Sequence, residues 1–408
     1  MTMFTPQSLV GVVGAGAMGR GIAQVAAAAG HPVVLADARP GAAADGRAAI
    51  AADLAKLVER GKMDAARREG ILTLITSVDD PPERHAHLDS RPPLVNIESF
   101  AHCDLIIEAI VEDLAVKRDL FRRLSHAVAP ETVLATNTSS LSIASIAADA
   151  ADASRVIGLH FFNPPPVLPL VEVVPWSGTS PAAADACVAL MTAWGKTPVR
   201  CTDTPGFIVN RVARPFYGEA LRIADEALAD YATIDWAMKE IGGFRMGPFE
   251  LMDFIGNDVN FAVTQSVYES FFHEARFRPS LTQQRLVAAG WLGRKTKRGF
   301  FDYRDGAPTA EPTRDPSLGA SIVERIRAML INEAVDALRL RVASAEAIDL
   351  AMQRGVNYPK GLLAWCDELG AARVLETMES LYAEYREERY RPSPLLRRAA
   401  QDDTKFRK

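Results

Sequence analysis

A glycine-rich turn stands between a short apolar run and an alanine-rich stretch near the start of the chain. Residues 9–13 form the apolar run, and Gly14, Gly16 and Gly19 follow in the spacing G-x-G-x-x-G. The first glycine permits a tight turn, the second lets a pyrophosphate approach the backbone, and the third lets helix and strand pack closely. The N-terminus of the helix then offers N–H groups to phosphates. This arrangement predicts a βαβ unit that binds a dinucleotide.

A carboxylate follows the next apolar run at the position that selects between dinucleotides. The run covers residues 32–36 and ends at Asp37. An acidic residue there accepts hydrogen bonds from the adenosine ribose hydroxyls and repels a 2′-phosphate. The sequence therefore predicts NAD, not NADP, as the cofactor. Arg39 is the one nearby residue that argues against this, and we interpret it as a solvated loop charge.

Further apolar runs alternate with helix-like stretches over the first two hundred residues. The runs are residues 105–110, 133–135, 156–159 and 171–174. This alternation is typical of a mostly parallel sheet covered by helices on both faces. A charged helical excursion is expected at residues 43–68, and a loop at residues 79–93, which are rich in Pro, His and Asp. We therefore expect an α/β domain of the doubly wound Rossmann type at residues 1–202.

Helical periodicity replaces the strand signals after Thr204, and a repeat appears within it. Residues 234–238 read IDWAM, and residues 348–352, 114 positions later, read IDLAM. Further matches are Gly247, Asp253 and Gly256 with Gly361, Asp367 and Gly370, and Arg278-Pro279-Ser280 with Arg391-Pro392-Ser393 after a one-residue slip. Matches in the same order predict two related helical modules. We place them at residues 203–305 and 306–408 and expect them to pack against each other.

The composition excludes several classes of function. The 408-residue chain carries a formal net charge of −5, without the broad excess of Lys and Arg that nucleic-acid phosphates require. No apolar stretch predicts a membrane span, and no signal peptide pattern is present. The four cysteines form no C-x-x-C pair, so neither a metal site nor a disulfide framework is indicated. We expect a cytoplasmic protein that binds neither nucleic acid nor a membrane.

One of the seven histidines occupies a position suited to catalysis. His160 follows the predicted strand 156–159 at its C-terminal end, the edge at which open α/β sheets bind ligands. Glu172 comes twelve residues later on the next strand, after a proline-rich turn at residues 163–166. A carboxylate bonded to one ring nitrogen fixes the tautomer and raises the basicity of the other. The spacing alone leaves open whether the two residues form such a pair.

Six segments, in this order, closely resemble the L-3-hydroxyacyl-CoA dehydrogenase family. They are VGVVGAGAMG (10–19), EAIVE (108–112), NTSSL (137–141), HFFNP (160–164), LVEV (170–173) and DTPGFIVNR (203–211). The resemblance covers residues 8 to about 304 and ends at GRKTKRGFFDY (293–303). It implies NAD-dependent oxidation of an (S)-3-hydroxyacyl-CoA to a 3-oxoacyl-CoA, the chemistry of fatty acid β-oxidation.

The resemblance also implies roles for individual residues. His160 abstracts the proton of the 3-hydroxyl group, and Glu172 holds its imidazole. Ser139 matches the serine that bonds the substrate oxygen, and Asn210 matches the asparagine near the reacting carbonyl. The positions that line the cofactor are matched by Glu112, Lys117, Asn137, Asn163 and Lys295. Lys56 and Lys62 lie on the arm that reaches over the substrate cleft, where they pair with coenzyme A phosphates or belong to a solvated helix face.

Three features depart from the family pattern. Lys297 stands where the family has a glycine, the segment near residues 79–97 is longer than usual, and a second helical module is present. In the simplest members one module on each chain makes the dimer. The duplication therefore suggests that the second module packs where a partner subunit otherwise lies, and it leaves homodimerisation open.

Two other functions and the identity of the acyl group also stay open. The chain could instead be a sugar-acid dehydrogenase of the L-gulonate or lambda-crystallin type, or a catalytically silent dinucleotide-binding protein. The sequence identifies no floor of the acyl pocket. Hydroxybutyryl, long-chain and hydroxyadipyl groups are therefore all compatible with it.

Overall fold

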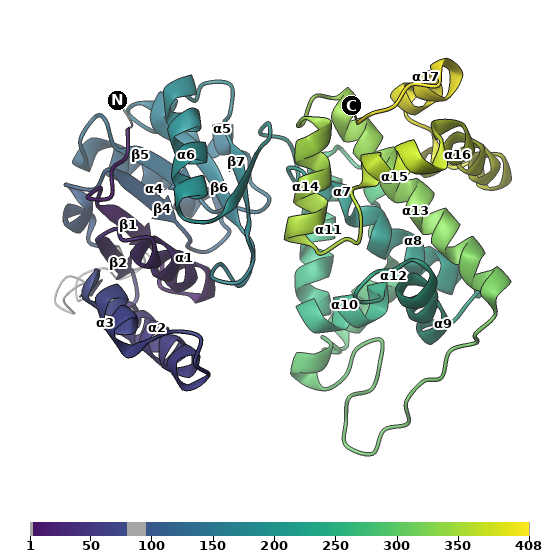
Figure 1. Cartoon of the computed structure of the whole chain (residues 1–408), viewed down its shortest axis with the longest axis horizontal. Helices are drawn as coiled ribbons and strands as arrows, with labels where there is room; N and C mark the ends of the chain where they lie inside the picture. The colour runs from purple at the N-terminus through teal and green to yellow at the C-terminus, as the bar shows by residue number, and fades with distance from the viewer. Residues whose placement is uncertain (1–2, 80–94, 408) are drawn as a thin grey trace. The chain divides into compact units, whose positions relative to one another are not determined.

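Two compact units, Met1–Asp203 and Thr204–Lys408, divide the chain, and we call them unit 1 and unit 2. The structure is a computed structural model that describes residues 3–79 and 95–407 (Figure 1). Most of the loop expected at residues 79–93, and of the longer segment near residues 79–97, lies outside the described residues. Within the described ranges, no helix is long and apolar enough to cross a membrane.

Unit 1 is built on one eight-stranded sheet in the order β3-β2-β1-β4-β5-β6-β7-β8. The strands are β1 (Val10–Val13), β2 (Val33–Asp37), β3 (Ile75–Asp79), β4 (Leu105–Glu108), β5 (Val133–Thr136), β6 (Val156–Phe161), β7 (Leu170–Val174) and β8 (Thr197–Arg200). The first six strands run parallel, whereas β7 runs antiparallel to β6 and parallel to β8. The strand order reverses at β1, which creates the crevice in which such sheets bind ligands. The expected doubly wound fold is confirmed.

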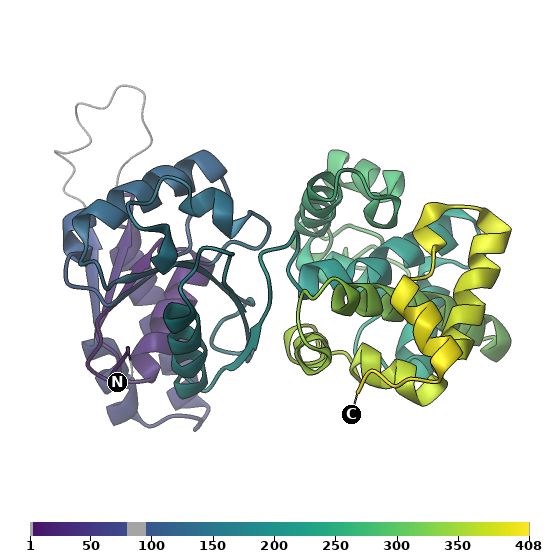
Figure 2. The same cartoon turned by 90° about the horizontal axis from the view of Figure 1, so that it is seen from above.

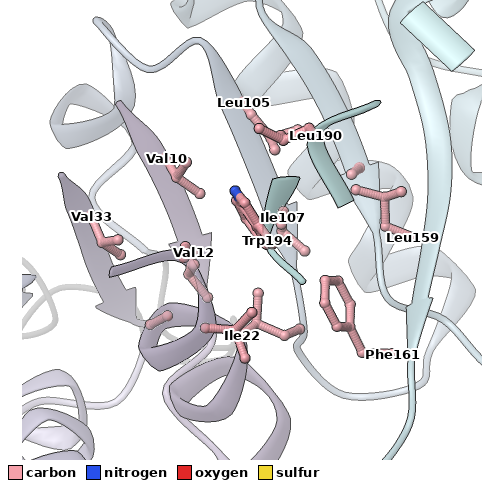
Figure 3. Close-up of a cluster of buried hydrophobic side chains, with 14 of the residues drawn as sticks. Val10, Val12, Ile22, Val33, Leu105, Ile107, Leu159, Phe161, Leu190 and Trp194 are labelled. Carbon is pink, nitrogen blue, oxygen red and sulfur yellow. The ribbon is translucent and has the colours of Figure 1, made fainter. Parts of the chain in front are cut away.

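Helices cover both faces of this sheet. They are α1 (Ala17–Ala28), α2 (Ala42–Glu59), α3 (Ala65–Thr73), α4 (Leu114–Ala127), α5 (Ile143–Ala147) and α6 (Pro181–Ala193), with short 3-10 turns η2 (Ile97–Phe100) and η3 (Ala153–Arg155). Ile22 of α1 and Leu190 of α6 join Val12 and Phe161 of the sheet in one buried apolar cluster (Figure 3). The opposite face is covered by α4 and α5, which contact each other (Figure 2).

Three local expectations for unit 1 were incomplete. The excursion expected at residues 43–68 consists of two helices, α2 and α3, separated by a turn, with β3 after them. Strands β3 and β8 were not expected, because both are edge strands whose residues are largely half-exposed and lack a continuous apolar run. Strand β6 extends to Phe161, so His160 lies within the strand and not after it.

Unit 2 is helical and contains two related modules, as expected. The first module has α7 (Val209–Val212), α8 (Arg214–Asp225), α9 (Tyr231–Trp236), the π-helical turn η4 (Ala237–Ile241), α10 (Pro248–Ile255), α11 (Asn257–Ser270), η5 (Ala275–Phe277), α12 (Leu281–Ala288) and η6 (Arg294–Thr296). The second has α13 (Pro316–Arg339), α14 (Ala345–Gly355), α15 (Leu362–Leu369), α16 (Ala371–Tyr385), η7 (Glu388–Tyr390) and α17 (Pro394–Asp402). Along the interface α13 packs on α8, with Leu330 and Ala334 fully buried and Leu338 half-buried.

The repeated residues perform the same structural task in each module. Asp235 accepts hydrogen bonds from the backbone N–H groups of Phe249 and Glu250, at 2.9 and 2.8 Å, and so holds the start of α10. Its counterpart Asp349 accepts the equivalent bonds at the start of α15, at 2.8 and 3.0 Å. A carboxylate at a helix N-terminus satisfies N–H groups that have no partner inside the helix. The sequence repeat therefore records a repeated helix-capping arrangement.

Candidate active site

The three glycines in the turn after β1 lie in different surroundings. Gly14 adopts φ +103°, and a Cβ added there would lie 2.5 Å from the carbonyl oxygen of Ala109. A Cβ on Gly19 would lie 1.7 Å from the carbonyl oxygen of Gly14, so only glycine lets the helix pack on the turn. A Cβ on Gly16 would meet nothing within 4 Å, so this side of the turn is open. None of the described side chains caps α1, which begins beside Gly16. Exposed N–H groups and an open glycine suit a pyrophosphate.

Asp37 is the last residue of β2 and braces this turn. Its Oδ2 accepts a hydrogen bond from the backbone N–H of Ala15 at 2.8 Å, and its Oδ1 accepts one from the N–H of Arg39 at 2.9 Å. The guanidinium of Arg39 is 73% exposed, and its Nε lies 3.5 Å from the same Oδ1. Arg39 is thus a largely exposed loop charge, as expected, and it also forms an ion pair with Asp37. The position of Asp37 beside the turn fits an adenosine ribose.

His160 and Glu172 face each other across the antiparallel pair β6 and β7. Their Cα positions are direct partners in the ladder, and His160 Nδ1 lies 2.6 Å from Glu172 Oε2. Both side chains are buried. Because an ionised carboxylate can only accept, this bond assigns the proton to Nδ1 and leaves Nε2 as the nitrogen that can take up a proton. The pair suggested by the spacing is therefore formed, and it has the geometry of a base with an orienting carboxylate.

Asn137 and Ser139 lie in the turn that follows β5, next to the end of β6. The side-chain oxygen of Asn137 accepts a hydrogen bond from the N–H of Phe161 at 2.8 Å, and so ties β6 to this turn beside His160. The N–H of Ser139 donates to Glu112 Oε1 at 3.0 Å. Asn163 is exposed just beyond β6, where it precedes Pro164 through a cis peptide bond. Ser139 thus follows β5, whereas His160 and Glu172 lie within the next two strands, β6 and β7.

Lys117 is buried and lies between two carboxylates. Its side chain is 1% exposed, and Nζ lies 2.5 Å from Glu108 Oε1 and 3.3 Å from Glu112 Oε2. Glu108, which is fully buried at the end of β4, was not among the expected site residues. The sequence did contain a signal for this pair, because a charged residue ends an apolar run at the ligand-binding edge of the sheet. Such a residue is almost never fully buried unless it is paired.

The remaining expected residues lie farther from these strand ends or in unit 2. Lys56 is exposed on α2 and pairs with Asp53 at 2.8 Å, and Lys62 is exposed in the turn between α2 and α3. In unit 2, Asn210 is the second residue of α7. Lys295, also in unit 2, has its Nζ 2.6 Å from Asp258 Oδ1.

The described part of the chain shows no metal site. Among residues 3–79 and 95–407, no group of three or more His, Cys, Asp or Glu side chains is arranged to hold a metal ion. All four cysteines are buried and free. Burial raises the pKa of the Cys187 thiol to about 12, which leaves it protonated and a poor ligand or nucleophile.

Family profiles match nearly the whole chain. The profile described as "3-hydroxyacyl-CoA dehydrogenase, NAD binding domain" matches residues 9–204. The profile described as "3-hydroxyacyl-CoA dehydrogenase, C-terminal domain" matches twice, at residues 206–303 and 322–408. The double match falls on the two related modules of unit 2.

Individual relatives agree with these profiles. The chain is 40% identical to a 3-hydroxyadipyl-CoA dehydrogenase of Escherichia coli K12, over 96% of this chain and 97% of the relative. It is 40% identical to the mitochondrial hydroxyacyl-coenzyme A dehydrogenase of Homo sapiens, over 72% of this chain and 91% of the relative. A crystal structure of a 3-hydroxybutyryl-CoA dehydrogenase from Escherichia coli K12 matches with a TM-score of 0.89 and 38% identity, covering 98% of this chain and 99% of the other.

Proposed function

This chain belongs to the 3-hydroxyacyl-CoA dehydrogenase family of NAD-dependent oxidoreductases, and from this premise we propose that His160 is the general base of the reaction. The proposed reaction converts an (S)-3-hydroxyacyl-CoA into a 3-oxoacyl-CoA. The observation that carries the proposal is the buried bond of 2.6 Å between His160 Nδ1 and Glu172 Oε2 at the ligand-binding edge of the sheet.

The proton of the 3-hydroxyl group goes to His160. With Nδ1 donating to the carboxylate, Nε2 carries the lone pair that accepts this proton. As the O–H bond breaks, the electron pair forms the C3=O double bond and the hydrogen on C3 departs with its electrons. When bound, NAD accepts that hydride. One proton and one hydride leave the substrate, so the oxidation is balanced.

Glu172 stabilises the charge that His160 gains. A protonated imidazole beside an ionised carboxylate is favoured over one in neutral surroundings, and the effect is strong where water is excluded. Glu172 is fully buried on β7, where its backbone is the ladder partner of His160. It therefore orients the ring and stabilises the charge that the ring gains.

Ser139 and Asn210 complete the proposed catalytic group. The hydroxyl of Ser139 would donate a hydrogen bond to the substrate oxygen, on which negative charge develops as the proton leaves. Asn210 would interact with the reacting carbonyl. Each contributes a hydrogen bond and no charge, so we expect the loss of either to be milder than the loss of the base.

The cofactor and substrate contacts are proposed from the same family premise. Gly14, Gly16 and Gly19 would hold the pyrophosphate and Asp37 the adenosine ribose, which suits the open glycine and the uncapped helix start. The resemblance assigns Glu112, Lys117, Asn137, Asn163 and Lys295 to the rest of the NAD site, and of these we propose Asn137, Asn163 and Lys295 as direct contacts. Lys56 and Lys62, exposed at the end of α2 and in the turn after it, would pair with the phosphates of coenzyme A.

An absorbance assay for NADH formation tests the proposal. The two Escherichia coli relatives that span almost the whole chain are named for hydroxyadipyl and hydroxybutyryl groups, so both thioesters and a long-chain one belong in the panel. We expect turnover that requires coenzyme A and is lost in the His160→Gln variant. Turnover of L-gulonate without coenzyme A would support a sugar-acid dehydrogenase instead. Cofactor binding without turnover of any of these compounds would indicate a catalytically silent protein.

A further inference from the structure

One carboxylate oxygen accepts four hydrogen bonds from the turn that carries Ser139. Glu112 Oε1 accepts hydrogen bonds from Thr138 Oγ1 at 2.6 Å and from Ser140 Oγ at 2.9 Å. It also accepts bonds from the backbone N–H groups of Ser139 and Ser140, at 3.0 and 3.2 Å. Two hydroxyls and two amides therefore converge on a side chain that is 26 to 28 positions away in the sequence. Ser139 lies between the two anchoring hydroxyls.

The other oxygen of Glu112 is fixed by a buried lysine. Lys117 Nζ lies 3.3 Å from Glu112 Oε2 and 2.5 Å from Glu108 Oε1. Glu108 in turn accepts hydrogen bonds from the hydroxyl of Thr136 at 2.7 Å and from the N–H of Ile110 at 2.7 Å. A buried ammonium placed between two carboxylates cannot easily reorient, because each charge would lose its partner in a medium of low dielectric constant. The network is therefore a rigid support at the ends of β4 and β5.

The charge state of Glu112 suits this support. Burial raises the pKa of the Glu112 carboxyl, but the positive charge of Lys117 and the hydrogen bonds from Thr138, Ser140 and Ser139 outweigh it, so the pKa lies below its usual value. An ionised carboxylate can accept all of these bonds at neutral pH, and charge-assisted bonds are the stronger kind.

We propose that Glu112 is a positioning residue for Ser139, which it holds at the substrate oxygen through the turn of residues 138–140, with Lys117 and Glu108 as its buried support. This inference rests on the proposed role of Ser139 in the reaction. It differs from the role expected for Glu112 and Lys117 as contacts of the cofactor. A cofactor contact changes the affinity for NAD, whereas a positioning residue changes the rate at which bound reactants react.

A double-mutant cycle between Glu112 and Ser139 separates these roles. Since a small misplacement of a reacting group can cost up to 10²-fold, we expect Glu112→Ala to lower kcat by roughly 10- to 100-fold while the dissociation constant of NADH stays near that of the wild type. Glu112→Gln, which keeps an acceptor oxygen, should recover part of this loss. The double variant with Ser139→Ala should be no slower than the slower single variant, because both changes remove the same contact.

Three results overturn the inference. One is a higher dissociation constant of NADH with kcat at saturating NAD unchanged, which would make Glu112 a cofactor contact. Another is a slow Ser139→Ala variant whose effect adds in full to that of Glu112→Ala, which leaves the role of Ser139 intact but removes the coupling. The third is an unaffected Ser139→Ala variant, which refutes the proposed role of Ser139 together with the inference.

Two further variants keep the test decisive if Glu112→Ala fails to fold. Thr138→Val removes one anchoring hydroxyl without changing any charge, and it should show a smaller loss of kcat with the same lack of additivity with Ser139→Ala. Asp149→Asn serves as the matched control. Asp149 is an exposed carboxylate of unit 1 that pairs with Arg118 at 2.8 Å, and its loss should leave both kcat and NADH affinity unchanged.

Discussion

Arg211 and Arg325 stand 114 positions apart, and each forms an ion pair with a glutamate of the other helical module. Arg211 Nε lies 2.6 Å from Glu333 Oε1, and Arg325 Nε lies 2.7 Å from Glu219 Oε1. Glu219 and Glu333 are themselves 114 positions apart. Such reciprocal contacts define an interface with two-fold symmetry, as in a symmetric dimer. Here the two halves of that interface belong to one chain.

Removing one partner of the buried ion pair between Arg211 and Glu333 should strongly destabilise unit 2. The side chains of Arg211 and Glu333 are at most 2% exposed. Arg211→Met therefore leaves the buried Glu333 carboxylate without one of its cationic partners. Breaking a buried pair by removing one partner typically costs 3–5 kcal/mol, and we expect a loss of about 3 kcal/mol because Arg276 still contacts Glu333. Urea unfolding measures this loss. Arg373→Met, which breaks an exposed pair with Glu324, is the control and should cost less than about 1 kcal/mol. Equal losses in the two variants would contradict the argument.

The central strands could be predicted from sequence because they are buried on both faces. β1 and β4 read VGVV and LIIE, with every residue buried, and an apolar run of this kind between glycines or polar turns has few other interpretations. β3 and β8 read ITSVD and TPVR and carry no comparable pattern. Their pairing is decided by the neighbouring strand, which supplies hydrogen bonds irrespective of side chains. A single sequence does not record that contribution.

Lys297 occupies a backbone conformation that favours glycine. It adopts φ +57°, in the left-handed region, at the position where the resemblance places a glycine. A residue with a side chain is destabilised by roughly 1–2 kcal/mol in this conformation. Glycine avoids this strain, but its unfolded chain has more conformational freedom, which offsets part of the increase in stability. Lys297→Gly should therefore raise the free energy of unfolding by up to about 1 kcal/mol. Thermal unfolding checks this, with Lys56→Gly inside helix α2 as a control that should be destabilised by about 1 kcal/mol. A destabilised Lys297→Gly variant would refute the explanation.

Asp37 should determine the choice of cofactor. Its carboxylate would lie close to a 2′-phosphate, so we expect NAD to be preferred over NADP by at least about tenfold in kcat/KM. Asp37→Ala should reduce the ratio of kcat/KM with NAD to kcat/KM with NADP. The affinity for NAD should also fall, because the N–H of Ala15 loses its hydrogen bond. Arg39→Gln should increase this ratio, since a cation 3.5 Å from the Asp37 carboxylate weakens its repulsion of a 2′-phosphate. Steady-state kinetics with both cofactors measure the ratio, and equal use of NAD and NADP by the wild type would disprove the assignment.

Asp235 should make stability depend on pH. Burial raises the pKa of Asp235 to about 7, although the N–H groups of Phe249 and Glu250 act in the opposite direction. The folded protein therefore binds this proton more tightly than the unfolded chain. Its contribution to stability is fully present below the unfolded pKa of about 3.9 and is lost as pH rises through about 7.

Chemical denaturation at several pH values tests this linkage. Between pH 4 and pH 7.5 the ionisation of Asp235 should lower the free energy of unfolding of the wild type by roughly 1–4 kcal/mol. The Asp235→Asn variant should lack this decrease. Other groups titrate equally in both proteins, so the difference between the two curves isolates Asp235. Parallel curves over this range would show that Asp235 ionises alike in the folded and unfolded states.

The candidate site was only partly predictable, for reasons that differ between residues. The sequence suggested His160 and Glu172 as a pair but left the pairing open, because a turn between two strands can bring them opposite each other only in one register, which the structure supplies. Lys117 could not be predicted as the partner of Glu108, since a buried ion pair between a strand end and a helix has no characteristic spacing. The burial of Lys117 emerges only when α4 packs beside β4.

The proposed mechanism depends on the proton acceptor, and the rate of the His160→Gln variant tests it most directly. Glutamine keeps similar size and polarity but cannot take up the proton, so kcat for oxidation should fall by roughly 10²- to 10⁴-fold while NADH binding stays near normal. Glu172→Gln should also slow the reaction, because an amide does not stabilise the imidazolium, and Ser139→Ala should be milder. Wild-type turnover by His160→Gln at neutral pH would contradict the account.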